Sequence, residues 1–371
     1  MPNTIAITSN TSWYLYNFRK NTILALQKKG YNVTAIAPKD AYSKKLEELG
    51  CQFIHVDIDA GGTHPVNDIK TFLSFCKIYR QLKPAAILNF TPKNNIYSTL
   101  AGWLCGASCI NNIAGLGILF INESLPSKIA RLLYRVTQSK ANKLFFQNEE
   151  DRTLFLNNKM APSELTDRLP GSGADLSRFK WSPASDDGQV RFLLIARMLY
   201  DKGIQQYVDA ARILHKKYPD TEFQLLGFLD VDNPSAVSRK AMEEWVAEGV
   251  VNYLGTSDAV DQEIGTVDCM VLPSYYREGV PKSLLEAGAM GKPIVTTDNV
   301  GCREMVDDGV NGFLCEPRSA DDLALKLEKI ILMSHEERLA MGRKSREKIE
   351  REFDEKIVIQ KYLDAVDDVL K

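Results

Sequence analysis

The sequence predicts an α/β protein built from two doubly wound domains, each with a parallel sheet. Short apolar runs alternate with helical patterns from the first residues, which is typical of right-handed βαβ units whose helices cover both faces of a sheet. This alternation stops once, near the middle of the chain, and then resumes. The length of 371 residues also suits two domains of ordinary size, each with its own core.

The first half of the chain contains apolar runs that we expect to form buried strands, because each is short and bounded by polar or turn residues. These runs are Thr4–Thr8, Asn32–Ala37, Gln52–Val56, Ala85–Phe90, Ser108–Ile113 and Lys143–Gln147. Helical patterns separate them near residues 17–29, 41–49, 66–82, 95–104, 124–140 and 149–157. We therefore expect an N-terminal domain over residues 1–180.

Residues 180–189 read KWSPASDDGQ, a stretch with no periodic pattern and a linker composition. A second series of expected strands follows at Arg191–Ala196, Glu222–Leu226, Val250–Leu254, Cys269–Leu272 and Ile294–Thr297. We expect a C-terminal domain over residues 181–353, with the strand ends of both domains facing a shared cleft, because ligands of open α/β sheets bind there. The charged segments Ser334–Glu352 and Asp354–Leu370 predict amphipathic helices with solvated faces.

The composition excludes several classes of protein. With 44% hydrophobic and 25% charged residues, the chain is neither disordered, nor collagen-like, nor a small disulfide scaffold. No apolar run approaches the ~20 residues of a membrane helix, and the N-terminal MPNTIAITSN lacks the layout of a signal peptide. The seven cysteines form no C-x-x-C pair, so we expect small buried side chains in a reducing cytoplasm.

The charge is unevenly distributed between the two halves. Residues 1–180 hold 22 Lys and Arg against 13 Asp and Glu, whereas residues 181–371 hold 24 against 35. We expect the first half to favour an anionic partner that the second half does not, such as a lipid surface or a phosphorylated acceptor. We expect no nucleic-acid partner.

The most informative stretch is residues 273–312, which read PSYYREGVPKSLLEAGAMGKPIVTTDNVGCREMVDDGVNG. An expected buried strand ends before it, and a short polar loop leads to a helix that opens near a proline, a residue favoured in the first helical turn. The free backbone amides of such a turn form a ready anion site for a diphosphate. The expected donor-binding residues here are Gly279, Val280, Pro281, Lys282 and Ser283.

Two acidic and two basic residues accompany this anion site. Glu286 is placed to accept hydrogen bonds from ribose hydroxyls, and Glu278 would face the sugar on the far side of the phosphates. Arg197 and Lys202 follow the strand at Arg191–Ala196 and can reach one diphosphate from two sides, Arg as a planar fork and Lys as a point charge. Taken singly, each of these residues has a bland alternative as a solvated side chain. Their joint arrangement favours a catalytic site made of Glu278, Arg197 and Lys202.

These residues resemble the E-x7-E signature of the retaining glycosyltransferases of family 4, which have the GT-B fold of two Rossmann-like domains. Leu169–Asp175 with Phe179, Leu272–Ser274 and Asn311–Leu314 resemble further passages of that family, so the resemblance covers essentially the whole chain. It implies a UDP-sugar donor, no required metal, and transfer with retention in which a leaving phosphate oxygen takes the acceptor proton. It also implies that residues 354–371 pack back on the N-terminal domain.

The N-terminal half resembles bacterial family members that extend an undecaprenyl-diphosphate-linked sugar, in particular the α-1,3-N-acetylgalactosaminyltransferases of protein glycosylation. The resembling passages are Tyr16–Arg19, Thr91–Asn95 and Ala114–Gly117. Arg19 and Lys93 follow the first and fourth expected strands, so we expect both to grip the acceptor diphosphate. The remaining expected acceptor contacts are Asn94, Asn95, His64, Gly115 and Gly117.

Two departures from the family pattern affect these expectations. The first loop reads Ser9–Trp13 instead of carrying a Gly-Gly pair, and the fifth loop has Asn111–Ala114 where many relatives carry a histidine. Other readings stay open: another UDP-sugar, a soluble acceptor, a sugar-nucleotide epimerase or hydrolase of the same fold, or a catalytically dead binding scaffold. A nicotinamide-dependent dehydrogenase is disfavoured, because no G-x-G-x-x-G follows the first strand.

Residues 128–143 read KIARLLYRVTQSKANK and combine apolar with basic side chains at helical spacing. A basic amphipathic helix can lie in a lipid interface, which would place the protein peripherally at the inner face of the cytoplasmic membrane. The alternative is an ordinary surface helix whose apolar stripe lies in the domain core.

Overall fold

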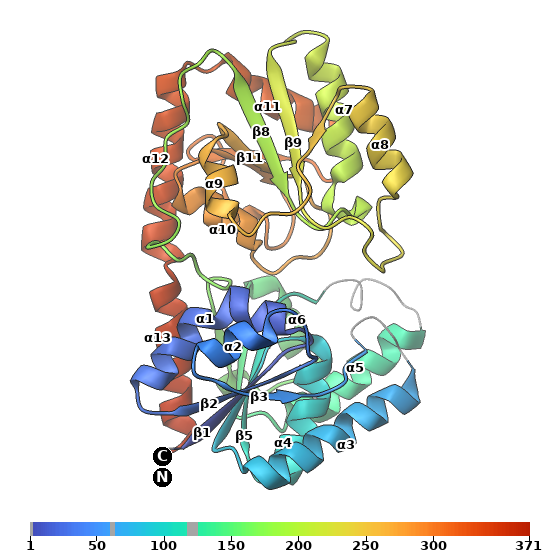
Figure 1. The fold of residues 1–371 in the computed structure, drawn as a ribbon, viewed down its shortest axis with the longest axis vertical. Coiled ribbons are helices and arrows are strands. Elements are labelled where there is room, and N and C mark those ends of the chain that lie inside the picture. The colour runs from blue at the N-terminus through green and yellow to red at the C-terminus, as the bar shows by residue number, and fades with distance from the viewer. Residues whose placement is uncertain (1–2, 60–63, 117–124) are drawn as a thin grey trace. The chain divides into compact units, whose positions relative to one another are not determined.

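The structure is a computed structural model that describes residues 3–59, 64–116 and 125–371, with the side chains of residues 125 and 126 left out. It forms two compact units (Figure 1). Unit 1 contains residues Met1–Ser172 and Lys356–Lys371, and unit 2 contains Gly173–Glu355. The second unit is therefore an insertion into the first.

Unit 1 contains a parallel sheet in the order β3-β2-β1-β4-β5-β6-β7 (Figure 1). Its strands are β1 (Thr4–Thr8), β2 (Asn32–Ala37), β3 (Gln52–His55), β4 (Ala86–Asn89), β5 (Ser108–Ile113), β6 (Lys143–Phe146) and β7 (Thr166–Arg168). The central strand β1 pairs with β2 on one side and β4 on the other. The expected strands are present, and β7 is an addition that the sequence did not predict.

Helices cover both faces of this sheet (Figure 1). They are α1 (Ser12–Lys28), α2 (Ser43–Glu48), α3 (Pro65–Leu82), the π-helix η1 (Asn94–Ser98), α4 (Thr99–Leu104), α5 (Leu125–Gln138), α6 (Glu149–Asn157), the 3₁₀ turn η3 (Ser163–Leu165) and α13 (Glu355–Val369). The last helix, α13, buries Tyr362 and Val366 in the same core as Ile5 and Ile7 of β1. The helix expected at residues 95–104 begins as a π-helix, which is a rare conformation found mostly at functional sites.

Unit 2 contains a parallel sheet in the order β10-β9-β8-β11-β12-β13. Its strands are β8 (Val190–Ile195), β9 (Thr221–Leu226), β10 (Asn252–Tyr253), β11 (Cys269–Leu272), β12 (Ile294–Thr297) and β13 (Gly312–Cys315). Its helices are η4 (Tyr200–Lys202), α7 (Ile204–His215), α8 (Arg239–Ala247), α9 (Val260–Gly265), α10 (Lys282–Ala289), η5 (Arg303–Met305), α11 (Ala320–Leu332) and α12 (His335–Glu352). Strand β13 was not predicted as a strand.

The division between the units lies at residues 172 and 173, earlier than the expected boundary after residue 180. Phe179 is buried in the core of unit 2, and Arg178 forms an ion pair with Asp261 at 3.1 Å, so this stretch packs with the second unit. The chain passes between the units twice. At these passages the Ala174 N–H donates to the carbonyl of Phe353 (2.8 Å), and the Glu355 N–H donates to the carbonyl of Ala174 (3.1 Å).

All seven cysteines are free thiols, and all except Cys105 are buried. Burial raises the pKa of Cys51 to about 11 and that of Cys109 to about 12. Buried thiols of this kind are inert packing residues, because the reactive species is the thiolate.

Candidate functional site

The loop after β11, residues 273–279, is held in place by the turn after β8. The carbonyl of Asp201 in η4 accepts hydrogen bonds from the backbone amides of Tyr275 and Tyr276, both at 3.1 Å. The two strands are neighbours in the sheet, so their carboxyl ends lie at one edge. This contact brings together two turns that are more than seventy residues apart in the sequence.

Two glycines allow the backbones around this loop to approach closely. Gly203 has φ +77°, and a Cβ there would lie 2.1 Å from the carbonyl oxygen of Pro273. Gly301 has φ +80°, and a Cβ there would lie 1.7 Å from the carbonyl oxygen of Gly279. Only glycine fits either position, because both the conformation and the space exclude a side chain. The loop is thus packed between the turns that follow β8 and β12.

Lys202 and Glu278 form an ion pair at the centre of this arrangement, between Lys202 Nζ and Glu278 Oε1. The hydroxyl of Ser274 donates a second hydrogen bond to the same carboxylate oxygen (2.9 Å). Lys202 Nζ also lies 4.9 Å from the centre of the Tyr276 ring. The two charged side chains are only 13% and 12% exposed, so water screens the pair far less than a surface pair. The sequence prediction named both charged residues but missed Ser274 and Tyr276, which lie in the same loop.

Arg197 follows β8 by two residues and is exposed. Burial raises the pKa of the Tyr276 hydroxyl, Glu278 adds to this shift, and the positive charge of Arg197 opposes it. The electrostatic effect on one tyrosine thus comes from both Arg197 and Glu278. Arg197 is the predicted site cation that solvent reaches best, whereas Lys202 is held by its carboxylate partner.

Glu286 lies in the second turn of α10 and is buried. Lys282, one turn earlier, places its Nζ 3.8 Å from Glu286 Oε1. Burial raises the pKa of the Glu286 carboxyl, while the charges of Lys282 and Arg178 oppose the shift. An ionised carboxylate has two acceptor oxygens, so a buried one is suited to accept hydrogen bonds from two vicinal hydroxyls.

The N-terminus of α10 offers donors for an anion. The helix is N-capped by Pro281, whose carbonyl accepts from the amides of Leu284 and Leu285, both at 3.2 Å. The first turn contains no acidic residue, so nothing opposes the positive end of the helix dipole. Gly279 and Val280 are buried just before the cap, and Lys282 and Ser283 in the first turn are half-buried.

In unit 1, three of the predicted acceptor residues, Lys93, Asn94 and Asn95, follow the carboxyl end of β4. Lys93 Nζ pairs with Asp68 Oδ1 at 2.6 Å, so its charge is already balanced by a carboxylate of α3. The next residue, Asn94, is fully buried and accepts a hydrogen bond from the Thr91 hydroxyl (2.6 Å). Its amide nitrogen has no hydrogen-bond partner within the described part of the chain.

A buried network of hydrogen-bonded polar side chains holds the segment that follows β4 in place. Gln138 of α5 donates to the carbonyl of Asn95 (2.7 Å) and accepts from the side-chain amide of Asn111 (2.7 Å). The side-chain oxygen of Asn111 accepts a hydrogen bond from the side-chain amide of Asn89 (2.8 Å). The side-chain oxygen of Asn89 accepts one from the hydroxyl of Thr8 (2.6 Å). The network joins α5 and the π-helix to the ends of β1, β4 and β5. The sequence signal for it is a row of polar residues at the carboxyl ends of otherwise apolar strands.

Arg19 differs from the sequence expectation. Its side chain is 0% exposed, so it does not present its charge to an acceptor diphosphate. Its guanidinium lies 4.3 Å from the centre of the Phe90 ring and donates a hydrogen bond to the Tyr14 hydroxyl (3.1 Å). The cause is visible in α1, where Arg19 lies four residues after Leu15 and seven before Leu26, on the buried stripe of the helix.

Of the remaining predicted acceptor residues, Asn95 lies in η1, and His64 and Gly115 lie in loops. His64 is exposed at the N-cap of α3 and makes no capping hydrogen bond through its side chain. Asn95 is buried and its side-chain amide donates to the carbonyl of Asn112 (2.9 Å). Gly115 has φ +113°, a conformation that favours glycine, and Gly117 lies outside the described residues.

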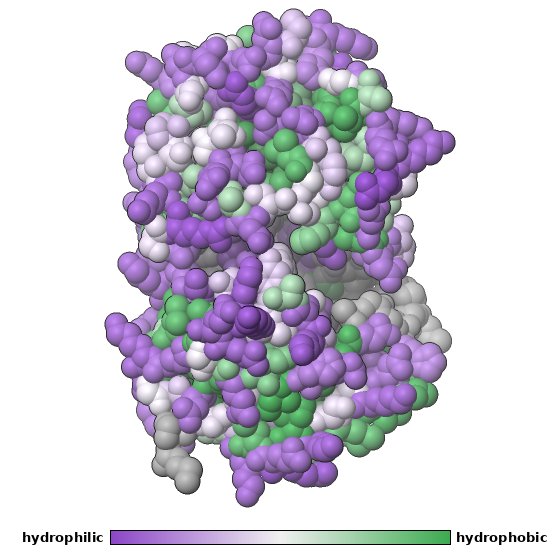
Figure 2. Space-filling view, in the orientation of Figure 1, coloured by the Kyte–Doolittle hydropathy of each residue, from purple (hydrophilic) through white to green (hydrophobic). Residues whose placement is uncertain are grey.

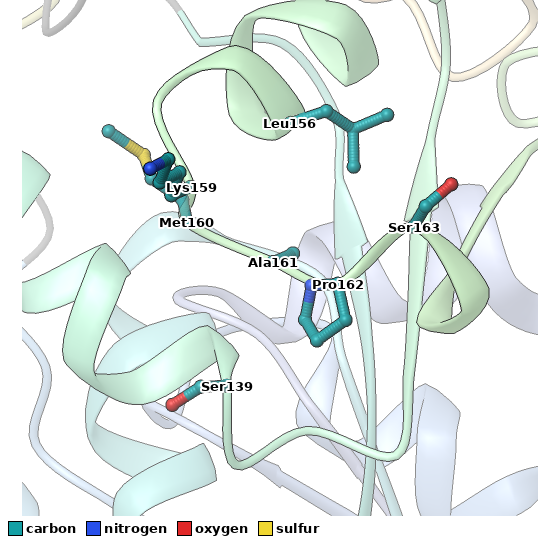
Figure 3. A pocket seen from close by; sticks show the side chains of 7 residues that line it. All are labelled: Ser139, Leu156, Lys159, Met160, Ala161, Pro162 and Ser163. Carbon is teal, nitrogen blue, oxygen red and sulfur yellow. The ribbon is translucent and has the colours of Figure 1, made fainter.

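Within residues 3–59, 64–116 and 125–371, no cluster of three or more His, Cys, Asp or Glu side chains is arranged to hold a metal ion. A surface pocket of about 460 Å³ lies between the end of α5 and the segment after α6 (Figure 3). Its lining includes Leu156, Met160 and Pro162, and none of its residues belongs to the predicted site. The candidate site is made of the turns that follow β8 and β11 in unit 2.

The chain matches two protein families. Residues 4–148 match the family described as glycosyl transferase 4-like, and residues 177–348 match glycosyl transferases group 1. The chain is also similar to an N,N'-diacetylbacillosaminyl-diphospho-undecaprenol alpha-1,3-N-acetylgalactosaminyltransferase of Campylobacter jejuni. The two sequences are 29% identical, and the similarity spans 99% of each chain.

Solved structures share the fold over the whole chain. A glycosyltransferase from Rickettsia africae has a TM-score of 0.78 at 17% identity, covering 100% of this chain and 99% of that one. Anabaena Alr3699/HepE, solved in complex with UDP, has a TM-score of 0.76 at 17% identity, covering 99% and 100%. At this level of identity the likeness concerns the fold of two parallel-sheet α/β domains.

Proposed function

We propose a transfer reaction for this chain, which belongs to the glycosyltransferases that join a transferase 4-like domain to a group 1 domain in the GT-B fold. In this reaction, a hexose or N-acetylhexosamine passes from a UDP-sugar to an undecaprenyl-diphosphate-linked sugar. The sugar we favour is N-acetylgalactosamine, by analogy with the similar Campylobacter jejuni enzyme. The product would be a lipid-linked intermediate of glycan, O-antigen or protein-glycosylation assembly.

The proposal depends on one observation, the Lys202–Glu278 ion pair, which joins the turn after β8 to the loop after β11. Helix α10 begins three residues after Gly279, directly beyond this loop. In our proposal the diphosphate of the donor binds the first turn of α10 together with Lys202 and Arg197. The two cations and the helix amides neutralise the leaving group without a metal. Glu286 accepts hydrogen bonds from the ribose hydroxyls.

The proposed reaction retains the configuration at the sugar. The bond between the anomeric carbon and the UDP oxygen breaks, and the acceptor hydroxyl forms its bond to the same face of that carbon. The proton of this hydroxyl passes to the leaving phosphate oxygen, so no side-chain base is needed. Glu278 stabilises the positive charge that develops on the sugar, and fixed charges of this kind are the largest contribution to many enzymatic rates. Lys202 holds Glu278 in place and meets the departing phosphate.

The proposed acceptor site lies in unit 1, at the carboxyl end of β4. Asn94 offers a buried amide donor, and the Lys93–Asp68 pair lies beside it. We keep Asn95, His64, Gly115 and Gly117 as proposed acceptor contacts, and we assign Arg19 to the core rather than to the acceptor. A sugar hydroxyl or acetamido oxygen is the kind of group that a buried amide donor recognises.

We further propose a peripheral location at the inner face of the cytoplasmic membrane, where an undecaprenyl-linked acceptor resides. In the described parts of the chain, no helix combines the length and the apolar character required to traverse a bilayer. The supporting segment is residues 128–143, which bear Lys128, Arg131, Arg135, Lys140 and Lys143 and no acidic side chain.

The test is mass spectrometry of a synthetic polyprenyl-diphosphate-linked sugar incubated with the enzyme and a panel of UDP-sugars. We expect the acceptor to gain the mass of one N-acetylhexosamine with UDP-N-acetylgalactosamine, and the new linkage to be α by nuclear magnetic resonance. Release of free sugar or of an epimerised donor, with no gain in acceptor mass, would instead identify a hydrolase or an epimerase.

Variants test the site within the same assay. Lys202→Ala and Glu278→Gln should each lower kcat by about 100-fold or more, because each removes a charge that acts in the transition state. The matched control is Lys217→Ala, which removes a lysine from an exposed ion pair with Glu328 in the same unit. Near-normal turnover of Lys202→Ala, with its fold intact by circular dichroism, would place the donor elsewhere.

A further inference from the structure

Helix α3 carries a stripe of apolar side chains that faces solvent. Val66, Ile69 and Leu73 are 51%, 57% and 57% exposed. Their spacing of three and four residues places them on one side of the helix. The opposite side, with Phe75 and Tyr79, is buried against the sheet. Isolated exposed apolar residues are normal, but a continuous helical stripe of this kind marks an interaction surface.

Helix α5 carries a second stripe with the same spacing. Ile129, Leu132 and Val136 are each more than half exposed, whereas Tyr134 is buried in the core. The sequence left open whether the apolar stripe of this segment lies in the core. The exposure values assign one stripe to the core and another to solvent. The solvent-facing stripe of α5 therefore repeats that of α3.

The end of α4 connects these stripes. Trp103 and Leu104 are exposed there, and Lys140, just after α5, stacks its ammonium group 4.7 Å from the centre of the Trp103 ring. Helices α3 and α5 both contact helix α4 and the π-helix η1 (Figure 1). Figure 2 shows hydrophobic residues at the surface over this part of unit 1. We call the exposed side of α3, α5 and the end of α4 the three-helix face.

The charge around the three-helix face is positive. Residues 125–148 contain five Lys and Arg and no Asp or Glu. Helix α3 adds Lys70, Lys77 and Arg80, and its acidic residue Asp68 is neutralised by Lys93 at 2.6 Å. A surface that combines apolar side chains with an excess of basic ones complements anionic lipid headgroups over an acyl layer. A second copy of this chain would bring the same positive charge and would be repelled.

We propose that the three-helix face docks on an anionic lipid bilayer, with the apolar stripes of α3 and α5 and the Trp103 ring inserted at the level of the headgroups. This inference rests on the proposed function, because it names the surface through which the enzyme meets a membrane that carries its acceptor. It extends the membrane contact from the basic segment of α5 to α3 and α4. Trp103 is suited to the interface, since tryptophan is enriched there.

The first experiment measures flotation of the full-length protein with vesicles. We expect binding to phosphatidylglycerol vesicles, weakened at high salt, and little binding to pure phosphatidylcholine. Ile69→Glu and Leu132→Glu should each weaken binding about tenfold, because a carboxylate opposes both insertion and the lipid charge. The matched control is Leu325→Glu in unit 2, where a leucine of similar exposure (58%) is replaced and binding should not change.

The second experiment reports on insertion depth. Lipids brominated near the headgroup should quench part of the tryptophan fluorescence of the bound protein, and Trp103→Phe should abolish this quenching. Quenching that persists in Trp103→Phe would show that another tryptophan enters the lipid, and the proposed orientation would be wrong. Binding of Ile69→Glu at the parental affinity would remove α3 from the docking surface and overturn the three-helix proposal.

The activity assay separates this inference from the proposed function. With a water-soluble short-chain acceptor diphosphate, Ile69→Glu and Leu132→Glu should transfer sugar at the parental rate, because neither residue belongs to the proposed site. With the same acceptor in vesicles, both should be slower. If the parental enzyme transfers no sugar to any acceptor yet still binds the vesicles, the proposed function fails and the docking surface stands.

Discussion

Glu286 is a carboxyl group that the fold buries at a cost to stability. Its folded-state pKa is raised above the ordinary value of about 4.5, chiefly by burial. The folded state therefore binds a proton more tightly than the unfolded state. The contribution of this group to stability is greatest below pH 4.5 and is lost as the pH rises through the folded-state pKa.

Replacing Glu286 with Gln should raise the free energy of unfolding at neutral pH, because the amide removes a desolvated charge. The gain should shrink as the pH falls and vanish well below pH 4.5, where the glutamate is protonated in both states. The same variant should raise the KM for the donor by about tenfold, since a hydrogen bond to an amide oxygen is weaker than one to a carboxylate.

Denaturant unfolding at several pH values and a donor titration measure both effects. Glu328→Gln is a matched control: the half-buried carboxylate of Glu328 pairs with Lys217, and its pKa is lowered rather than raised, so the pH dependence should have the opposite sign. A Glu286→Gln enzyme with unaltered donor KM would show that Glu286 is only a buried helix residue.

Single residues also show where sequence reasoning succeeds. Lys202 and Glu278 were named together although 76 positions separate them, because the carboxyl ends of neighbouring parallel strands must meet at one sheet edge. Arg19 was misplaced because a positive charge near an expected site was assumed to face a ligand. Its helical spacing from Leu15 and Leu26 already placed it on the buried stripe. The sequence alone did not show which aromatic rings surround the Arg19 guanidinium. They include Tyr362, which is 343 positions later in the chain.

At the scale of elements, the π-helix η1 depends on hydrogen bonds from a neighbouring helix. Gln138 of α5 donates to the Asn95 carbonyl inside η1 and accepts from Asn111. Gln138→Leu should leave these two buried groups with only their long contact to each other (3.5 Å). We expect a loss of about 1–3 kcal/mol in the free energy of unfolding and a higher KM for the acceptor, with an unchanged KM for the donor.

Chemical denaturation and steady-state kinetics with each substrate varied measure these changes. Gln360→Leu serves as the control, because Gln360 is exposed on α13 and its side-chain amide donates to Asp364 of the same helix (2.7 Å). If Gln138→Leu raised the KM for both substrates equally, the network would support the fold in general and would not position η1.

Element type was predictable wherever a single periodic signal dominated. The buried runs Asn32–Ala37, Ser108–Ile113 and Cys269–Leu272 became strands with the expected bounds, since only strands bury such short apolar runs at this spacing. Strand β7 escaped prediction because its sequence, Thr-Asp-Arg, is polar and lies at the edge of the sheet. The π-helix escaped as well, because its extra residue per turn is set by tertiary hydrogen bonds and not by local sequence.

At the scale of the whole molecule, the last helix belongs to the first unit. Tyr362 of α13 is fully buried, with ring centres 5.6 Å from Phe90 and 5.2 Å from Phe145. Tyr362→Ala should lower the stability of unit 1 by about 3–5 kcal/mol, the usual cost of deleting a buried aromatic ring. Unit 2 has its own core and should keep its stability.

Hydrogen exchange resolved by peptide mass spectrometry tests this prediction. We expect protection to fall in β1, β4 and β6 of unit 1 and to stay unchanged in β8 and β11 of unit 2. Tyr253→Ala, which truncates a half-buried ring in unit 2, should show the reverse pattern. Equal loss of protection in both units after Tyr362→Ala would mean that they unfold as one cooperative body.

The two-domain organisation followed from the interruption of the alternating pattern, but the position of the boundary did not. The linker composition of residues 180–189 indicates an irregular segment, and this segment belongs to unit 2. The passage itself, at residues 172–174, contains Gly173, where space is limited. A Cβ at Gly173 would lie 2.4 Å from the Cα of Glu355, so the two passages of the chain lie against each other.

Because residues 173–355 leave and re-enter unit 1 through adjacent passages, they form a cassette with neighbouring ends. Such a cassette can be replaced by its counterpart from a relative without altering the connectivity of the surrounding sheet. A chimera joined at these points would be expected to inherit its choice of nucleotide sugar from the inserted piece and its choice of lipid-linked glycan from the flanking ones.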